Sequence, residues 1–232
     1  MSSPQSSAKS RLRSSLRRAR LALGPEERRE QSDALRGVVL DHLRATPRGG
    51  GRGDEDDDAG RPIVAAFLGA APEPETLELL EELHGLGFRV VLPVCEPDHR
   101  LAWASWTPGV ALERSAYAPV DEPTGPRQTF AALSPVALLL VPALGMDRAG
   151  HRVGQGGGYY DRFLAQHPRD AADAVPRFGM VYRSELLPAG AVPTDPWDQP
   201  LDGVFTPDGP VRTRSDPGRE QHGMTPRPDA AV

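Results

Sequence analysis

The sequence predicts an α/β fold, with one domain in which a mostly parallel sheet lies between helices in three layers. Continuous apolar runs, typical of strands buried on both faces, occur at 63–68, 90–94, 136–141 and 178–182. Segments with helical spacing alternate with these runs, which is the pattern of parallel sheets built from β-α-β units. A glycine-rich segment follows the third run. The expected architecture is therefore Rossmann-like, with an additional basic helix at the N-terminus.

Two helices are expected before the first strand. Helical spacing of Leu12, Leu16, Ala19 and Leu23 predicts a helix that Gly24 ends, and its other face is rich in arginine. Pro25 suits the first turn of a second helix, and the acidic residues that follow it suit the positive end of that helix. The apolar stripe of the second helix comprises Ala34, Leu35, Val38, Val39 and Leu43.

The later elements are shorter. A helix is predicted over 76–86, ended by Gly87, with inward-facing leucines at Leu77, Leu80, Leu83 and Leu86. We expect a more exposed strand at 101–106, irregular structure over 109–135, a helix over 160–166 and a short last strand at Val204-Phe205.

The ordered domain is expected to span 1–206. Within it, 46–62 combines glycines with a run of acidic residues and predicts a flexible insertion, because it has no apolar surface to bury. Consecutive acids do not provide the spaced ligands of a calcium loop. Proline, glycine, arginine and aspartate dominate 207–232, which predicts a disordered tail.

Composition excludes several classes of protein. The net charge of −5 argues against nucleic-acid binding over a basic face. No apolar run approaches the ~20 residues of a membrane-spanning helix. The single cysteine, Cys95, excludes an internal disulfide framework and a cysteine-based zinc cluster, and the six scattered histidines suggest no zinc site. A reducing, cytoplasmic location is expected.

The most informative segment is Arg152 to Leu164, RVGQGGGYYDRFL. Glycines let the backbone approach a ligand closely, and the N-terminus of a following helix attracts anions. The segment lacks the Lys-Ser or Lys-Thr of a P-loop, and Tyr159 stands where a dinucleotide fingerprint has its third glycine. The residues alone leave a phosphate-binding loop and a structural turn both open.

Three segments are expected at the carboxyl edge of the sheet, where α/β proteins bind ligands: 68–76, the glycine-rich loop and 196–202. Glu73, Asp161 and Asp198, one from each segment, could serve with Arg152 as a magnesium–nucleotide site. Each carboxylate also has a plain structural explanation: a helix start, an ion pair and a turn residue. Three aromatic residues could line a pocket, although core packing is the simpler role for any one of them: Trp103, Trp106 and Tyr117.

The basic N-terminal helix permits three interpretations. Arginine and serine without acids before Glu26 are typical of a transit peptide. The same composition suits an arm that binds a membrane surface or nucleic acid. Alternatively, the helix folds over the active site and supplies cations to phosphates.

Residues along the whole ordered region resemble the 5-formyltetrahydrofolate cyclo-ligase family, also called methenyltetrahydrofolate synthetases. The most specific match comprises 141–147, Gly150, Arg152 and 154–164. Supporting similarity lies at Lys9 to Arg13, at Leu68 and 73–76, at Glu122-Pro123 and at 198–202. The resemblance covers roughly 8–206, and its long glycine-loop motif is the most specific part.

The resemblance implies an ATP- and Mg²⁺-dependent ligase that converts 5-formyltetrahydrofolate to 5,10-methenyltetrahydrofolate with release of ADP and phosphate. It implies a monomer that acts on a small-molecule folate, without nucleic-acid or membrane partners. Phosphate contacts would come from Lys9, Arg13 and Arg152, the last also being catalytic, and magnesium would bind Asp161 and Asp198. Leu68 and Glu73 would contact the substrate, and the loop between nucleotide and folate would comprise Gly154, Gln155, Gly156, Gly157, Gly158 and Tyr159.

Some positions depart from the family pattern. Met146 replaces the usual phenylalanine, Gln155 stands where many relatives carry tyrosine or a basic residue, and Gly157 replaces a lysine of some relatives. Under this resemblance the N-terminal helix is an active-site arm and not a cleaved peptide. Two alternative functions remain at this stage: a nucleotide- or folate-binding relative without turnover, and a sugar-phosphate enzyme on a similar sheet.

Overall fold

The computed structural model describes residues 4–46, 60–69, 71–171, 174–195 and 198–213. An eight-stranded sheet forms its centre, and its strands run in the spatial order β13-β12-β10-β7-β1-β2-β3-β6. The strands from β12 to β2 are parallel to their neighbours, whereas β13, β3 and β6 are antiparallel. Their bounds are Gly209–Arg212, Gly203–Thr206, Arg177–Met180, Val136–Pro142, Ile63–Ala65, Arg89–Glu96, Arg100–Trp106 and Arg127–Gln128.

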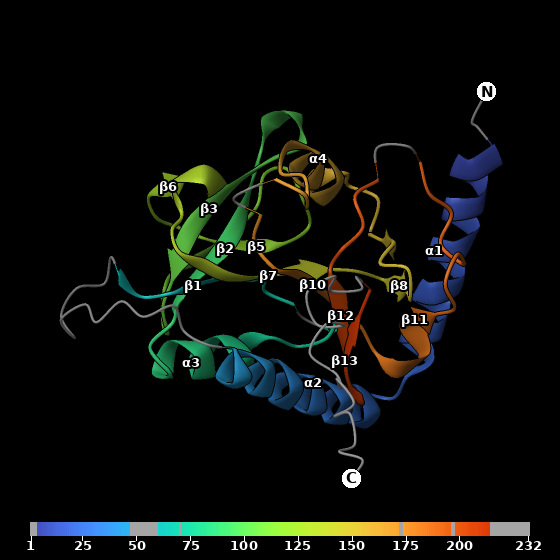
Figure 1. Cartoon of the computed structure of the whole chain (residues 1–232), viewed down its shortest axis with the longest axis horizontal. Coiled ribbons are helices and arrows are strands. Elements are labelled where there is room, and N and C mark those ends of the chain that lie inside the picture. Colours follow the sequence, from blue (N-terminus) through green and yellow to red (C-terminus); the bar gives the residue numbers. More distant parts are fainter. Residues whose placement is uncertain (1–3, 47–59, 70, 172–173, 196–197, 214–232) are drawn as a thin grey trace, which may run out of the picture.

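Helices cover both faces of this sheet, which confirms the predicted α/β architecture (Figure 1). Helices α2 (Pro25–Ala45) and α3 (Leu77–Gly85) lie on one face, and α4 (Tyr159–Gln166) lies on the other. Successive residues of β1 alternate between two hydrophobic clusters, because side chains of a strand point to opposite faces. Val64 belongs to the cluster beneath α2 and α3, whereas Ile63 and Ala65 belong to the cluster beneath α4.

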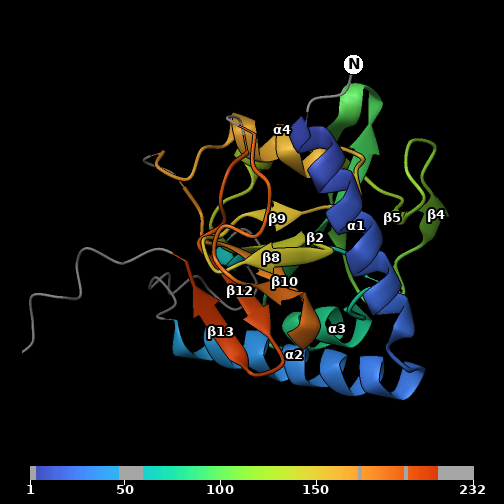
Figure 2. The same ribbon diagram turned by 90° about the vertical axis from the view of Figure 1, so that its right-hand side faces the viewer.

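Helix α1 (Pro4–Ala22) stands beside a second, smaller sheet of β11 (Leu186–Leu187), β8 (Gly145–Asp147) and β9 (Arg152–Val153) (Figure 2). Leu16 of the helix packs there with Leu144, Val153 and Val192. A third sheet pairs β4 (Leu112–Arg114) with β5 (Asp121–Pro123). Short 3₁₀ turns occur at Pro97–His99, Phe130–Ala132 and Arg183–Glu185.

Glycine and proline positions explain several element ends. Helix α2 begins at Pro25 after an extended Gly24, with acidic residues in its first turn, as the sequence predicts. The residue after Leu86 is Gly87, which has a φ of +85° and turns the chain out of α3 into β2.

Several expectations about individual elements are wrong. In α3 the buried leucines are Leu79, Leu80 and Leu83, whereas Leu77 is 48% exposed at the start of the helix. Strand β3, by contrast, is more exposed than β2, as we predicted, since Ser105 is exposed, although α4 contacts the strand and Trp103 is fully buried. The region 109–135 is less irregular than expected, since it contains β4, β5 and β6.

The predicted C-terminal tail begins too early. Residues Gly209–Arg212 form β13, an antiparallel partner of β12 that contacts α2, so the sheet extends beyond 206. A hairpin between the two strands brings these few residues back onto the sheet, although glycine, proline and arginine make up most of them. The rest of the predicted tail, 214–232, and most of the predicted insertion, 47–59, lie outside the described residues.

Candidate functional site

The glycine-rich loop joins β9 to the start of α4. Gly156 and Gly158 have φ values of +106° and +75°, which L-residues with a side chain rarely adopt, so the glycines are required by the backbone. Gly158 is the N-cap residue of α4, and the loop therefore leads into the N–H groups of the first helical turn. The loop follows the central strand β7, as expected, and the β8–β9 hairpin lies between the two.

Helix α1 holds this loop from the side (Figure 2). Arg13 Nε donates a hydrogen bond of 3.0 Å to the carbonyl of Gly154. Arg17 Nη2 donates to both oxygens of Gln155, at 2.6 Å to the carbonyl and 3.2 Å to the side chain. The N-terminal helix thus places its cations against the glycine-rich loop.

Lys9 connects the first turns of α1 to an acidic segment near the C-terminus. Its ammonium group donates to Asp195 at 3.0 Å and to Asp198, and Asp198 also accepts the backbone N–H of Asp195 at 2.8 Å. Burial lowers the pKa of Lys9, but the hydrogen bonds and charges of Asp198 and Asp195 raise it by more than burial lowers it. The pKa of Lys9 is therefore above its usual value. Lys9 is therefore an ammonium ion fixed between two carboxylates.

Arg152 lies at the base of the loop and forms a second ion pair. Its Nη2 donates to Asp161 at 2.6 Å, and its side chain is 6% exposed. Its guanidinium carbon lies 6.0 Å from the ring centre of Tyr160. Within the described part of the chain, Arg152 Nε and the buried Tyr160 hydroxyl have no hydrogen-bond partner. Burial raises the pKa of Tyr160, so this hydroxyl is neutral and retains its proton.

The loop after β1 brings Glu73 to the same region. Gln155 Nε2 donates to Glu73 Oε1 at 2.8 Å, which ties this loop to the glycine-rich loop. The buried Thr76 hydroxyl folds the loop, because it donates to the carbonyl of Phe67 at 2.7 Å and accepts the N–H of Gly69 at 2.8 Å. Leu68 is half-buried and packs against the hydrophobic cluster under α2 and α3.

A buried ion pair anchors the C-terminal end of α1. Arg20 is 1% exposed; its Nε donates to Glu185 at 2.5 Å, and its Nη2 donates to Glu185 at 2.8 Å and to the carbonyl of Ala143 at 2.7 Å. Burial raises the pKa of Glu185, although Arg20 opposes the shift. The remaining nitrogen, Nη1, lies 3.9 Å from Glu73 Oε1. Arg20 therefore links the anchor of α1 to the loop that carries Glu73.

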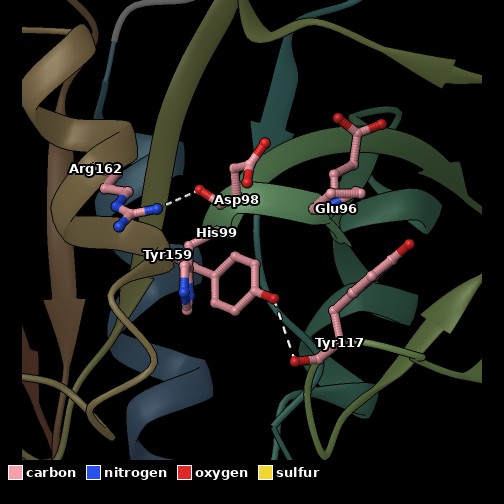
Figure 3. Close-up of a pocket in the computed structure, with 7 residues that line it drawn as sticks. Glu96, Asp98, His99, Tyr117, Tyr159 and Arg162 are labelled. Atoms are coloured by element: carbon pink, nitrogen blue, oxygen red, sulfur yellow. Dashed lines mark hydrogen bonds between the residues drawn. The ribbon is translucent and has the colours of Figure 1, made fainter.

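A cavity of about 400 Å³ opens on the other side of Tyr159 (Figure 3). Tyr159 donates from its hydroxyl to the carbonyl of Tyr117 at 3.2 Å, and its ring centre lies 5.2 Å from that of His99. Arg162 of α4 donates to the carbonyl of Asp98 (Figure 3). The lining residues are Glu96, Pro97, Asp98, His99, Tyr117, Tyr159 and Arg162. Tyr159 therefore contributes to both the glycine-rich loop and the cavity wall.

Comparison with known proteins identifies the family. The model of the 5-formyltetrahydrofolate cyclo-ligase family matches residues 5–207. The chain belongs to this family. The 5-formyltetrahydrofolate cyclo-ligase of Mycolicibacterium smegmatis is 32% identical over 210 residues, which cover 88% of this chain and 95% of that protein. The Escherichia coli cyclo-ligase is 32% identical over 146 residues, covering 62% of this chain and 77% of that protein.

Solved structures agree with this assignment. The NMR structure of the Aquifex aeolicus 5,10-methenyltetrahydrofolate synthetase has a TM-score of 0.65 and 26% identity, covering 93% of this chain and 97% of that chain. The synthetase of Mycoplasma pneumoniae, with a TM-score of 0.57 and 19% identity, shares the fold over 89% of this chain and 99% of that chain. These matches confirm the resemblance, the fold and the assignment of the chain as a cyclo-ligase family enzyme.

Most residues that the resemblance to the cyclo-ligase family implies are brought together. Arg13 contacts the glycine-rich loop, Arg152 directly precedes it, and Glu73 accepts a hydrogen bond from Gln155 of the loop. Lys9 lies on the same helix as Arg13 but contacts Asp195 and Asp198. Leu68 is half-buried and packs on the core, and its contact with the substrate stays a prediction. The described residues contain no group of three or more histidine, cysteine or acidic side chains suited to a metal ion. Magnesium usually takes only one or two protein carboxylates, so Asp161 and Asp198 still fit its chemistry.

Sequence reasoning missed Asp195, Arg17, Arg20 and Glu185, although each contacts an expected site residue or anchors α1. One signal was available for the arginines: residues 9, 13, 17 and 20 recur at the spacing of a single helical face. Our expectation that the leucines and the cations occupy opposite faces of this helix is wrong, since Ala19 is exposed and Arg20 is buried.

Core packing, the simpler role, is confirmed for two of the three aromatic residues and is wrong for Tyr117. Trp103 and Trp106 are core residues with 0% and 3% exposure, whereas Tyr117 is 53% exposed and lines the cavity.

Among the helices of the described residues, none is long and apolar enough to span a membrane.

Proposed function

We propose that this enzyme uses ATP and Mg²⁺ to convert 5-formyltetrahydrofolate to 5,10-methenyltetrahydrofolate, releasing ADP and phosphate. The observation that carries the proposal is that Arg13 and Arg17 of α1 hydrogen-bond to the glycine-rich loop, in a chain of the cyclo-ligase family. A loop with positive-φ glycines and nearby cations suits a triphosphate, because backbone N–H groups and cations both neutralise phosphate charge.

The nucleotide side of the site is assigned to the cations at the loop. Arg152 and Lys9 would contact phosphate oxygens, with Arg13 beside the loop carbonyl that it already holds. Asp161 and Asp198 would hold magnesium, which neutralises phosphate charge when it is bound. Both carboxylates are paired with cations in the free protein, so binding must exchange these partners.

We assign the cavity beside Tyr159 to the folate. Rings of Tyr117, Tyr159 and His99 offer apolar faces to a flat heterocycle, and the cavity directly adjoins the glycine-rich loop through Tyr159. Glu73, which accepts a hydrogen bond from the Gln155 side chain, would also accept hydrogen bonds from the pterin side of the substrate. The loop would then separate the nucleotide from the folate by a single layer of backbone.

This arrangement suits activation of the formyl oxygen. The oxygen is a poor leaving group until it is phosphorylated, after which N10 of the folate can attack the formyl carbon, and phosphate departs as the ring closes. Such a step depends mainly on in-line positioning and on cancellation of phosphate charge. Arg152, Lys9 and Arg13 supply that positive charge, and no general base is assigned. Exclusion of water by α1 would protect the phosphorylated substrate.

The proposal is tested by following methenyl-folate formation spectrophotometrically with purified full-length protein. We expect product only when 5-formyltetrahydrofolate, ATP and Mg²⁺ are all present. Binding of ATP or folate without product would indicate a binding protein and overturn the proposal. Turnover without ATP would overturn the assigned role of the nucleotide.

Replacement of Arg152 tests the assigned catalytic cation. We expect Arg152→Ala to lower kcat by ~10²–10³, because it removes a charge-assisted contact that acts mainly in the transition state. Arg152→Lys should recover part of this loss, since the charge remains while the planar fork is lost. An unchanged kcat in Arg152→Ala would show that Arg152 only holds Asp161.

We further propose that the enzyme acts as a monomer in the cytoplasm, without nucleic-acid or membrane partners. The buried, free thiol of Cys95 supports a reducing compartment. Light scattering would give the oligomeric state, and fractionation of cells would give the location.

A further inference from the structure

The carboxylate of Asp147 is completely buried at the end of β8. It contacts two chain segments that each carry residues of the proposed site. Its Oδ1 accepts the backbone N–H groups of Ala149 and His151, both at 3.0 Å. Its Oδ2 accepts those of Gly190 at 3.0 Å and Val192 at 3.3 Å. A buried carboxylate needs such donors to compensate for the water it has lost.

The two oxygens hold two different segments. Oδ1 holds the turn between β8 and β9, which ends directly before Arg152 and the glycine-rich loop. Oδ2 holds 190–192, which leads within a few residues to Asp195 and Asp198. One side chain therefore joins the segment that carries the proposed phosphate-binding residues to the segment that carries a proposed magnesium ligand.

Further contacts keep the same turn in place. The N–H of Leu201 donates to the carbonyl of Gly150 at 2.9 Å, and the N–H of Arg148 donates to the carbonyl of Leu187 at 3.1 Å. Gly150 has a φ of +95°, and a Cβ at this position would lie 2.6 Å from the Leu201 carbonyl oxygen. The β8–β9 turn therefore packs closely against Leu187 and Leu201, and Asp147 begins this turn.

We propose that Asp147 is a positioning residue, which fixes the glycine-rich loop and Arg152 relative to Asp195 and Asp198 so that phosphate and metal can be held together. The proposal rests on the proposed use of ATP and Mg²⁺. It differs from a purely structural role, because it predicts a selective loss of metal and nucleotide binding. Most residues that line the folate cavity belong to other segments, 96–99 and Tyr117, and only Tyr159 and Arg162 follow from the glycine-rich loop, so folate binding should change much less.

Asp147→Asn is the most informative change, because asparagine has nearly the same shape but keeps only one acceptor oxygen. That oxygen can serve one segment, and the amide N–H₂ then faces the N–H donors of the other. Residues that orient metal ligands typically contribute about 10- to 100-fold to metal affinity. We therefore expect Asp147→Asn to weaken Mg²⁺ activation by about 10- to 100-fold and nucleotide binding in parallel.

The experiment uses the full-length protein and measures three quantities in each variant. These are the Mg²⁺ concentration for half-maximal activity, calorimetric binding of an ATP analogue that is not hydrolysed, in the presence of Mg²⁺, and binding of 5-formyltetrahydrofolate. In Asp147→Asn the first two should weaken, and the folate dissociation constant should stay within about twofold, since the change is local. Should Asp147→Asn fail to fold, Asp147→Glu keeps the charge and both oxygens and is measured in the same way, with a smaller loss expected.

Thr206→Val provides a control for general destabilisation. Thr206 is buried in the β12–β13 hairpin, where its hydroxyl bonds to Gly209 and Asp208, away from the loop segments. It should lower the midpoint of urea unfolding without shifting Mg²⁺ activation. The proposal is overturned if Asp147→Asn leaves Mg²⁺ activation unchanged, or weakens folate binding as much as nucleotide binding. A wild-type protein without ATP-dependent turnover would instead overturn the proposed function.

Discussion

Lys9→Met should change the affinities for Mg²⁺ and for ATP in opposite directions. Methionine keeps the length and helix propensity of lysine but removes the ammonium group that lies 3.0 Å from Asp195 and also contacts Asp198. The side chains of these carboxylates are 21% and 16% exposed, so the group is better shielded from water than a surface ion pair.

The magnitude follows from the geometry. At 3.0 Å, Coulomb's law with an effective dielectric constant of about 20 gives an attraction of roughly 5.5 kcal/mol before the cost of desolvation is subtracted. Hydrogen bonds to charged groups contribute a net ~1.5–3 kcal/mol, which corresponds to about 10- to 150-fold in an equilibrium constant. Removing the ammonium should therefore strengthen Mg²⁺ binding to the nucleotide-free protein by at least about tenfold and weaken binding of the ATP analogue by a similar factor.

Titration calorimetry with Mg²⁺ alone and with the ATP analogue alone measures both affinities. Arg11→Met is a matched control, because Arg11 lies on the exposed side of the same helix. Weaker binding of both ligands to Lys9→Met would show that the ammonium does not compete with the metal, and our reasoning would be refuted.

The Lys9 interactions also predict a pH effect on the stability of the folded protein. Since the pKa of Lys9 is raised in the folded protein, its stabilisation is complete below the ordinary value of 10.5 and is lost as the pH rises further.

Three further predictions concern the metal, the thiol and the packing of the core. Asp161→Asn should raise the Mg²⁺ requirement by about tenfold in activity titrations; an unaltered requirement would reassign this carboxylate to its ion pair alone. Burial raises the pKa of Cys95 to about 11, so alkylation of this single thiol should be slow at pH 8 and accelerate towards pH 11; rapid reaction at pH 7 would contradict this. Gly179→Ala would place a Cβ against the sulfur of Met146 and should lower the free energy of unfolding by ~1–3 kcal/mol, measured in urea. Gly37→Ala in α2 meets no atom and should be neutral or stabilising, so equal losses in both variants would refute the packing argument.

The central strands were predictable because both of their faces are buried. Residues 63–65, 136–141 and 178–180 read as continuous apolar runs, and the structure places each run between two helical layers. The strands β8, β9 and β11 have only two or three residues each, too few for any period to be visible in the sequence. The register of α3 was mistaken because its leucines permit two inward faces, and only packing selects Leu79 over Leu77.

The identities of site residues were more predictable than their contacts. Arg152 could be singled out from the glycine-rich motif, and Lys9 and Arg13 from the resemblance to the family, and their roles at the site stay predictions. Their partners could not be singled out, because Lys9 and Asp198 are separated by 189 positions and meet only through the fold. Asp147 shows the same limit: in the sequence it is only one position of the family match at 141–147, and only the four N–H groups around it reveal what it holds together.

Because Arg20 anchors α1, the way in which α1 is altered decides whether an experiment can test its supply of cations to the site. Removal of the whole helix would take away Arg20 and leave the fully buried Glu185 without its guanidinium partner. Loss of one partner of a buried ion pair typically costs ~3–5 kcal/mol, so a truncated chain would lose activity through misfolding, whatever the phosphate contacts contribute. Lys9 is better suited to the question, because it lies about three helical turns from Arg20 and outside the hydrophobic cluster of Leu16. A point change at Lys9 therefore separates charge supplied to the site from charge that holds the helix in place.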